Sequence, residues 1–331
     1  MTRQLPHTAV RLATSVTVLA LTTAILAGCG GDSSGTDSKG GKLEKDTLTV
    51  AGLPLTDGAA LHIAQQRGLF EKEGLTVRIQ PVQQSIQALP ALAKGQVDVV
   101  SSANYVTILQ AREKGTLSPR ILADGATLTP HMMDVLTLPG SKIEDAGDLK
   151  GKKVSVNILN NIQSLTLDSI LADRKAGPPK YRQIPFPQMG VALEKGQVDA
   201  VHAAEPFATD LKRKLKARTV VDGGARPAKG LPVSGYVSTA KFTEENPRAA
   251  AAFQRAIARA QAMAGKDRGA VEKVLPSYAK IKPAQARTIK LPGYPAATDP
   301  ARLDRLAGLM ERDGLLKKKP DARALLFQPP K

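Results

Sequence analysis

The residues of this chain that could hold a ligand lie in four short stretches, each directly after a predicted strand. Parallel strands bring their carboxyl ends to one edge of a sheet, where open α/β sheets bind ligands. Helices that start there present free N–H groups and a partial positive charge, which suit oxyanions. The pattern predicts a binding cleft formed by Pro54, Thr56 and Asp57, by Ser102, Asn104 and Tyr105, by Asn160, Asn161 and Gln163, and by Glu205.

Two of these stretches are related by an internal duplication. Residues 91–99 read ALAKGQVDV and residues 192–200 read ALEKGQVDA, with seven of nine positions identical. Each copy has the pattern of a helix end, a glycine stop and a buried strand, and two copies are too few for a solenoid. The duplication therefore predicts two lobes of similar plan, in which Asn104 and Glu205 are equivalent positions. Asp98 and Asp199, inside the copies, are interpreted as structural.

Helix capping is the competing interpretation for most of these side chains. Asp57, Asn104 and Asn161 are all favourable N-caps, and each taken alone is a cap more often than a ligand contact. Glu205 is harder to explain in this way, because a carboxylate after a buried strand is costly unless it is paired or partly hydrated. We expect Glu205 to face the cleft.

Signals for catalysis and for metal binding are absent from the sequence. The four histidines are residues 7, 62, 131 and 202, and they form no HExxH motif or His/Cys cluster. The chain also lacks a G-x-S-x-G elbow, a Walker A motif and a G-x-G-x-x-G turn after a strand. We therefore expect a protein that is not an enzyme and has no cofactor and no metal, with His62 and His202 as packing or surface residues.

The elements that must position the cleft residues alternate between strand and helix. Residues 46–52, 75–81 and 96–101 have strand patterns, and residues 59–67, 85–94 and 105–114 have helical patterns that end at glycine. The same alternation starts again at residues 153–157. Alternation of this kind predicts βαβ units around a parallel sheet, and thus an α/β fold with two lobes.

The first 28 residues have the pattern of a secretory signal peptide. Arg3 and Arg11 precede an apolar run over residues 12–25, which is shorter than the roughly 20 residues that a spanning helix needs. The run ends in Leu-Ala-Gly-Cys at residues 26–29, which resembles the bacterial lipobox, and Cys29 is the only cysteine. We expect cleavage before Cys29 and lipid on its sulfur. Residues 30–45 are polar and Gly/Ser-rich, which indicates a flexible tether.

The composition restricts the partners of the protein. The chain has 331 residues and a net charge of +17, and without Arg3 and Arg11 it keeps 45 basic against 30 acidic residues. A basic balance can indicate nucleic acid binding. With 3% aromatic residues and no Trp, the aromatic residues of a single-strand binder are missing, and export makes such a partner unsuitable. We expect no nucleic acid partner and a solvated basic surface near an anionic membrane or wall.

Five stretches of the chain together resemble a known family. They are GLFEKEGLTVRI (68–79), ALAKGQVDVV (91–100), DLKGKKVSV (148–156), LEKGQVDAVHAAEPFA (193–208) and YVSTAKFTEENP (236–247). In order and spacing they are similar to solute-binding proteins of ABC importers, in the branch for nitrate, aliphatic sulfonates, taurine and thiamine-pyrimidine precursors. The resemblance implies a two-lobed type II periplasmic-binding-protein fold with the ligand in the inter-lobe cleft.

The resemblance also implies a division of the chain. Residues 1–28 would be the signal peptide, 29–45 the lipidated cysteine and tether, 46–137 lobe I and 138–235 lobe II. Residues 236–331 would return to lobe I as a helical segment. The chain would change lobes near residues 134–138 and 234–239, and binding would close the lobes by a hinge motion.

The function implied by the resemblance is that of a monomeric receptor. It would be lipid-anchored on the outer face of the cytoplasmic membrane and would deliver a small molecule to an ABC permease and its ATPase. The family's cleft positions correspond here to Pro54, Asp57, Asn104, residues 160–163 and Glu205. A small organic anion or zwitterion of the sulfonate or taurine type is expected, because Glu205 suits an amine donor and suits nitrate poorly.

Three alternatives remain open. The first is a receptor for a pyrimidine or another heterocyclic vitamin precursor, in which Tyr105, Phe207 or Tyr236 would stack on the ring in the absence of Trp. The second is a secreted enzyme, although the cysteine-rich motif of the eukaryotic pyrimidine synthases is absent. The third is a degenerate receptor that serves as a cell-surface interaction protein.

Overall fold

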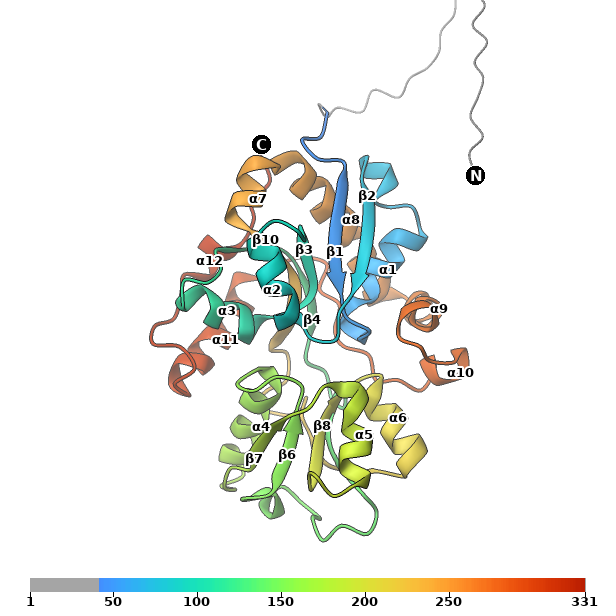
Figure 1. Cartoon of the computed structure of the whole chain (residues 1–331), viewed down its shortest axis with the longest axis vertical. Coiled ribbons are helices and arrows are strands. Elements are labelled where there is room, and N and C mark those ends of the chain that lie inside the picture. The colour runs from blue at the N-terminus through green and yellow to red at the C-terminus, as the bar shows by residue number, and fades with distance from the viewer. Residues whose placement is uncertain (1–41, 331) are drawn as a thin grey trace, which may run out of the picture. The chain divides into compact units, whose positions relative to one another are not determined.

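The computed structural model describes residues 42–330, which form two lobes, each built on a five-stranded sheet (Figure 1). The predicted signal peptide, Cys29 and most of the tether lie outside the described residues. The sheet of lobe I has the order β2-β1-β3-β10-β4, and that of lobe II has the order β7-β6-β8-β5-β9. The strands of lobe I are β1 (Thr47–Gly52), β2 (Thr76–Pro81), β3 (Val99–Asn104), β4 (Pro119–Thr127) and β10 (Pro232–Thr239). Those of lobe II are β5 (Met133–Thr137), β6 (Lys153–Val156), β7 (Lys180–Gln183), β8 (Ala200–Ala204) and β9 (Arg218–Asp222).

The two lobes repeat one plan, as the duplication predicts. In each lobe three strands pair in parallel and a fourth strand runs antiparallel to the third. The connecting helices in lobe I are α1 (Ala59–Gln66), α2 (Ser85–Ala93) and α3 (Tyr105–Glu113). Those in lobe II are α4 (Ile162–Asp173), α5 (Phe186–Glu194) and α6 (Phe207–Leu215). The prediction of βαβ units in an α/β fold is confirmed.

The aspartates of the repeated phrase have a structural role in both lobes. Asp98 accepts a hydrogen bond from the Thr49 backbone N–H at 2.9 Å, and the Lys45 ammonium pairs with it at 2.7 Å. Asp199 accepts from the Lys153 backbone N–H at 2.7 Å. Each carboxylate therefore holds the start of the neighbouring parallel strand, β1 or β6, in register with the strand that follows the phrase. This confirms their structural interpretation.

The predicted lobe boundary at residue 137 lies one strand too late, and the predicted boundary at residue 235 falls within β10. β4 belongs to lobe I but β5 pairs with β8 and β9 in lobe II, so the chain crosses first at residues 128–132. β9 belongs to lobe II but β10 pairs with β3 and β4 in lobe I, so the chain returns at residues 223–231. Burial patterns predict that a segment is a strand, whereas its sheet depends on which backbone partner it finds in the folded chain.

The C-terminal part packs mainly on lobe I. Helix α8 (Pro247–Lys266) lies against α1 and β4, and its apolar residues Phe253, Ala256, Ile257 and Ala260 are buried. The remaining helices are α7 (Ala240–Glu245), α9 (Arg268–Tyr278), α10 (Pro283–Ala286), α11 (Pro300–Arg312) and α12 (Ala322–Leu325). Within residues 42–330, we find no helix with both the length and the apolar character that a bilayer crossing requires.

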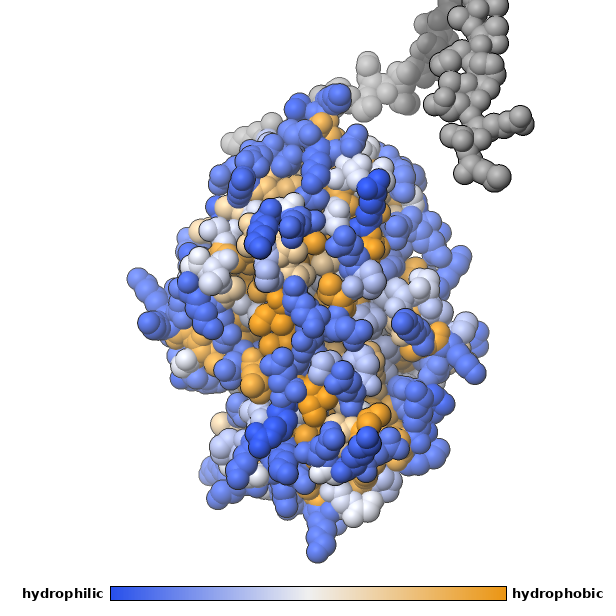
Figure 2. Space-filling view, in the orientation of Figure 1, coloured by the Kyte–Doolittle hydropathy of each residue, from blue (hydrophilic) through white to orange (hydrophobic). Residues whose placement is uncertain are grey.

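The surface of the described chain is mostly hydrophilic on the face shown in Figure 2, with small apolar groups between the charged side chains. The large hydrophobic side chains that remain exposed are Ile86, Leu159, Val191 and Met263. Ile86 follows the start of α2, and Leu159 lies in the loop between β6 and α4. These two elements also contribute Ser85 and Ile158 to the wall of the cavity described below.

Candidate ligand-binding site

A cavity lies between the lobes, at the carboxyl ends of their parallel strands. Its volume is about 40 Å³, well below the roughly 300–1,000 Å³ common for small-molecule sites. Both lobes contribute to its wall. The predicted residues that line it are Thr56, Asp57, Ser102, Asn104, Asn161, Gln163 and Glu205. The structure thus brings together residues from all four stretches that the sequence singled out.

The two lobes touch directly around this cavity. The Gln84 side-chain amide, just before α2, donates to the backbone carbonyl of Asn157, just after β6. Gln110 of α3 donates to the carbonyl of Asn160 at 3.2 Å. The backbone N–H of Thr56 approaches the Glu205 carbonyl at 3.5 Å. Contacts of this kind between opposite lips are expected of a closed arrangement of the lobes.

Asp57 is a buried carboxylate whose hydrogen bonding is incomplete. It lies in the short helix η1 (Thr56–Gly58) after β1 and is 5% exposed. Ser234 of β10 donates to Oδ2 at 2.5 Å, whereas Oδ1 has no partner among the described residues. Burial raises the pKa of the Asp57 carboxyl, and the hydroxyls of Ser234 and Ser102 lower it only in part. Asp57 therefore keeps one free acceptor in the cavity wall.

Asn104 both caps a helix and keeps donors for the cavity. Its side-chain oxygen accepts from the backbone N–H groups of Val106 and Thr107 at 3.1 and 3.4 Å, which is the N-cap of α3. An amide carries its acceptor and its donors on different atoms. The oxygen is used by the cap, and the side-chain NH₂ makes no hydrogen bond within residues 42–330. Asn104 thus confirms the capping interpretation and still lines the cavity.

Ser102 precedes this cap in an unusual backbone conformation. Its φ is 55°, in the left-handed region that non-glycine residues rarely occupy. It is 4% exposed, lines the cavity, and its hydroxyl has no partner among the described residues. Left-handed non-glycine residues cost about 1–3 kcal/mol and gather at functional sites. The conformation places an unpaired hydroxyl beside the carboxyl group of Asp57.

Glu205 lines the cavity, but its carboxylate is fully engaged by the protein. Thr209 donates to it through its backbone N–H at 3.0 Å and its hydroxyl at 2.7 Å, which caps helix α6. The backbone N–H of Lys290, in the C-terminal part, donates to Oε1 at 3.2 Å. Burial raises the pKa of Glu205, and these donors offset that effect in part. Both oxygens are used without any ligand.

The predicted residues at the start of α4 are also engaged internally. Asn161 caps α4 by accepting from the Gln163 N–H at 3.0 Å, within a capping box completed by Ser164. The side chain of Gln163 accepts from the backbone N–H of Asn157 at 2.8 Å and donates to the backbone carbonyl of His202. These residues hold β6, β8 and α4 together. They line the cavity, but their polar atoms are used in hydrogen bonds within lobe II.

Three predicted site residues do not reach the cavity wall. Tyr105 is 1% exposed, and its hydroxyl donates to Asp124 of β4 at 2.7 Å, passing so close to Gly235 that a Cβ there would lie 2.1 Å from it. Asn160 is exposed with φ of 52° and contributes its carbonyl to the contact with Gln110. Pro54 is partly buried outside the lining. Successive side chains at the start of a helix point in directions about 100° apart around its axis. Residues that are adjacent in the sequence therefore face different surroundings.

Several lining residues were not predicted from the sequence. Ser85 and Phe186 are the first residues of α2 and α5. They also stand at helix starts after strands, the feature that led to the residues of α3 and α4. Met132 lies on the first segment where the chain changes lobes, and Met133 and Ser234 lie in β5 and β10, the strands that follow the two crossings. No residue pattern marks them, because their place depends on the exchange of β5 and β10 between the sheets.

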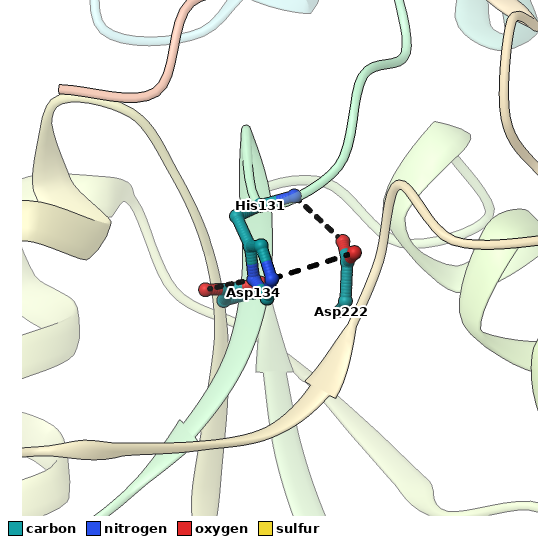
Figure 3. Close-up of side chains that lie close together, drawn as sticks. All are labelled: His131, Asp134 and Asp222. Carbon is teal, nitrogen blue, oxygen red and sulfur yellow. Dashed lines mark hydrogen bonds and ion pairs between the residues drawn. The ribbon is translucent and has the colours of Figure 1, made fainter.

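His131, Asp134 and Asp222 form a cluster beside the crossing segments (Figure 3). The His131 Nδ1 lies 3.1 Å from Asp134 Oδ1, and its Nε2 lies 3.8 Å from Asp222 Oδ2. The Lys212 ammonium already pairs with Asp134 at 2.5 Å. A ring with one nitrogen towards each carboxylate, and a lysine beside them, suits direct contacts between these side chains better than a metal ion, which takes one nitrogen and is repelled by the ammonium.

The histidines predicted as packing or surface residues, His62 and His202, do not line the cavity. His62 stacks on Tyr278 with ring centroids 3.7 Å apart, and burial lowers its pKa to about 4. His202 is fully buried in β8, and burial lowers its pKa to about 4 as well. Its ring nitrogens have no partner within the described part of the chain. Both rings are therefore neutral packing groups at neutral pH.

Comparison with known proteins identifies a family and a fold. Residues 56–268, more than half of the chain, match the family model described as NMT1/THI5 like. The nitrate/nitrite binding protein NrtA of Nostoc sp. is 23% identical over 241 residues, which cover 66% of this chain and 54% of that protein. A 4-amino-5-hydroxymethyl-2-methylpyrimidine phosphate synthase of Schizosaccharomyces pombe is 26% identical over 140 residues, 42% of this chain and 39% of the synthase. The chain thus spans about half or less of these curated relatives.

The likeness to a solved structure covers a larger part of the chain. The alkanesulfonate-binding protein SsuA of Xanthomonas axonopodis pv. citri, bound to MOPS, superposes with a TM-score of 0.72 at 19% identity. The match covers 86% of this chain and 99% of that structure. At this identity the likeness shows the fold, which is the two-lobed periplasmic-binding-protein fold expected from the sequence.

Proposed function

The chain belongs to the NMT1/THI5-like family, and from that premise we propose that it is the extracytoplasmic solute-binding component of an ABC importer. The observation that carries the proposal is the inter-lobe cavity, which is lined by strand-end residues of both lobes. A site divided between two lobes couples binding to lobe closure, because a ligand that contacts both faces is bound more tightly in the closed form. That coupling is what a permease needs in order to distinguish loaded from empty receptor.

The proposal includes the location and partners expected from the sequence. A signal peptide over residues 1–28, lipid on Cys29 and a tether up to residue 45 would hold a monomer at the outer face of the cytoplasmic membrane. There it would deliver its small-molecule ligand to a permease and its ATPase. Globomycin, which blocks lipoprotein signal peptide cleavage, and a Cys29→Ala variant test the anchor. Release of the variant into the medium is expected, and retention of Cys29→Ala in the membrane would contradict it.

A secreted enzyme is the alternative from another class, and a synthase is among the relatives. The wall of the cavity offers Asp57 and Glu205 as its acid–base groups, and it offers no cysteine or histidine among the described residues. Glu205 is used as a helix cap, which leaves a single carboxylate. This supports reversible binding over turnover.

Ligand-induced closure tests the proposed function. The purified protein would be screened by thermal shift against sulfonates, amino sulfonates, amines and pyrimidines, and hits would be followed by small-angle scattering. The expected result is a rise in melting temperature together with a smaller radius of gyration. A stabilising solute that is converted to product would instead favour an enzyme, and absence of any stabilising small solute would count against the receptor.

A further inference from the structure

The cavity wall is acidic, in contrast to the rest of the protein. The chain carries 47 Lys and Arg against 30 Asp and Glu. Within residues 42–330, however, the only ionisable side chains that line the cavity are the carboxyl groups of Asp57 and Glu205, and no Lys, Arg or His reaches it. The basic surface therefore supplies no cationic side chain to the ligand.

The two carboxyl groups differ in what they leave for a ligand. Glu205 accepts three hydrogen bonds from Thr209 and Lys290. Asp57 accepts one, from Ser234, and its Oδ1 has no partner. A buried carboxylate oxygen without a donor or a cation is costly, so Asp57 Oδ1 can take a donor either from the nearby Ser102 hydroxyl or from a ligand in the cavity.

Two serine hydroxyls lie near this carboxyl group. A Cβ on Gly58, beside Asp57, would lie 3.2 Å from the Ser102 Oγ and 3.8 Å from the Ser101 Oγ. Both hydroxyls are buried and have no hydrogen-bond partner within the described residues. Each hydroxyl is both a donor and an acceptor, and the cavity wall that includes Ser102 also contains the apolar residues Leu55, Met132 and Phe186.

An oxyanion is a poor ligand for such a cavity. Its charge would lie near two buried carboxyl groups in a low-dielectric space, where repulsion is weakly screened. The donors in the wall are neutral hydroxyl and amide groups, among them those of Ser85, Asn104 and Asn157, which can hold one acceptor of a ligand but do not balance a full negative charge next to Asp57. A nitrogen cation in the same place would be attracted to the Asp57 carboxylate, whereas an oxyanion would be repelled by it.

We propose that Asp57, together with the hydroxyl of Ser102, is the specificity-determining site for a nitrogen donor group of the ligand. The ligand class is a small solute with an apolar body and an ammonium, amidinium or amino-heterocycle N–H group, zwitterions included. Isolated oxyanions such as nitrate or a simple sulfonate are excluded. The inference rests on the proposed function, because it specifies the ligand of the same cavity.

The pH dependence of binding follows from the chemistry of Asp57. Burial raises the pKa of this carboxyl in the ligand-free protein. A cationic ligand binds the ionised carboxylate, so that its association releases a proton at pH values below that raised pKa. Affinity for a cation should therefore rise with pH through this range and become constant above it, whereas binding of a permanently charged anion would weaken.

Matched pairs of solutes test the inference. Isothermal titration calorimetry would compare taurine with isethionate, which has a hydroxyl in place of the amine, and 4-aminopyrimidine with pyrimidine, alongside benzamidine, methanesulfonate and nitrate. At least one amine or amidine probe should bind about 100-fold more tightly than its partner or than the anions. Asp57→Asn should remove that preference, since it keeps the size of the side chain and removes the charge.

An Asp173→Asn variant is the matched control. Asp173 is an exposed carboxylate at the end of α4, outside the cavity wall, and its loss should leave every affinity unchanged. Melting curves of both variants show that they fold. Binding of isethionate or methanesulfonate as tight as that of the amines, or Asp57→Asn with unchanged amine affinity, overturns the inference and leaves the proposed function intact. Binding of no probe at all overturns both.

Discussion

The two faces of the cavity are built on the same backbone plan but are used differently. Asn104 in lobe I and Glu205 in lobe II follow equivalent strands, β3 and β8, and both cap the next helix. Asn104 caps with one atom and keeps its NH₂ for the cavity, whereas Glu205 uses both oxygens inside the protein. The equivalent positions of Asn104 and Glu205 therefore place both side chains at the cavity. The chemistry of each side chain decides which hydrogen-bonding atoms stay free for a ligand.

The same contrast holds for the neighbouring polar residues. In lobe I, Asp57 and Ser102 keep unpaired atoms at the cavity. In lobe II, the polar atoms of Asn161 and Gln163 make hydrogen bonds to the start of α4 and to the ends of β6 and β8. We infer that lobe I carries most of the recognition and lobe II mainly provides a preorganised surface that closes over the ligand.

Loss of the Glu205 carboxylate is expected to have the largest effect, and on stability rather than on binding. Glu205→Ala removes three hydrogen bonds to a buried carboxylate and should lower the free energy of unfolding by about 4 kcal/mol. Urea unfolding measures this, and titration of the folded variant should give a ligand affinity within about twofold of the original. A large loss of affinity with little loss of stability would break the contrast between the lobes.

Acid should destabilise lobe II through His202, with an effect of about 3 kcal/mol. Burial lowers the pKa of this ring to about 4, below the unfolded value near 6.5. Stability from this group is present above pH 6.5 and is lost as pH falls towards 4, because only the unfolded chain takes up the proton. His202→Asn should show a correspondingly flatter dependence of unfolding free energy between pH 7 and 4. Parallel curves for both proteins would contradict the lowered pKa.

Two substitutions at Asn104 separate its two uses. Asn104→Ala should cost about 1 kcal/mol of stability from the lost cap and about tenfold in ligand affinity. Asn104→Ser keeps a good capping group but removes the amide donors, so its stability should be retained while affinity falls as much as in the alanine variant. If the serine variant binds as tightly as the original protein, Asn104 is only a cap.

The smallest effect is expected at the contact between the lips of the cavity. Gln84→Ala removes the hydrogen bond from α2 to the Asn157 carbonyl, and should weaken ligand binding about three- to fivefold by making the closed form less stable. Scattering of the ligand-free variant should show a larger radius of gyration. Gln87→Ala, on the same helix and bonded only to Gln84, is the control. Equal behaviour of the two variants would exclude a role for Gln84 in closure.

Much of the cleft could be predicted from the chain, since strand ends and helix starts are local features. The spacing of Asp57, Ser102, Asn104, Asn161, Gln163 and Glu205 after strand patterns placed all of them at the cavity wall. The prediction was wrong for Tyr105, because a position after a strand does not determine the direction of the side chain. Here Gly235 leaves space for the Tyr105 ring to reach Asp124. The sheet of β5 and β10 could not be assigned, because it depends on backbone pairing across about 100 residues.

The sequence by itself determined the α/β plan, its duplication and the equivalence of Asn104 with Glu205. These follow from periodicity, glycine stops and a repeated phrase, all of which are local in the chain. Only the tertiary structure decided which polar atoms remain free. Thr209 and Lys290 satisfy Glu205, whereas nothing in residues 42–330 satisfies Asp57 Oδ1. Hydrogen-bond capacity is shared among residues distant in the chain, and what is left for a ligand is known only once the protein's own donors are placed.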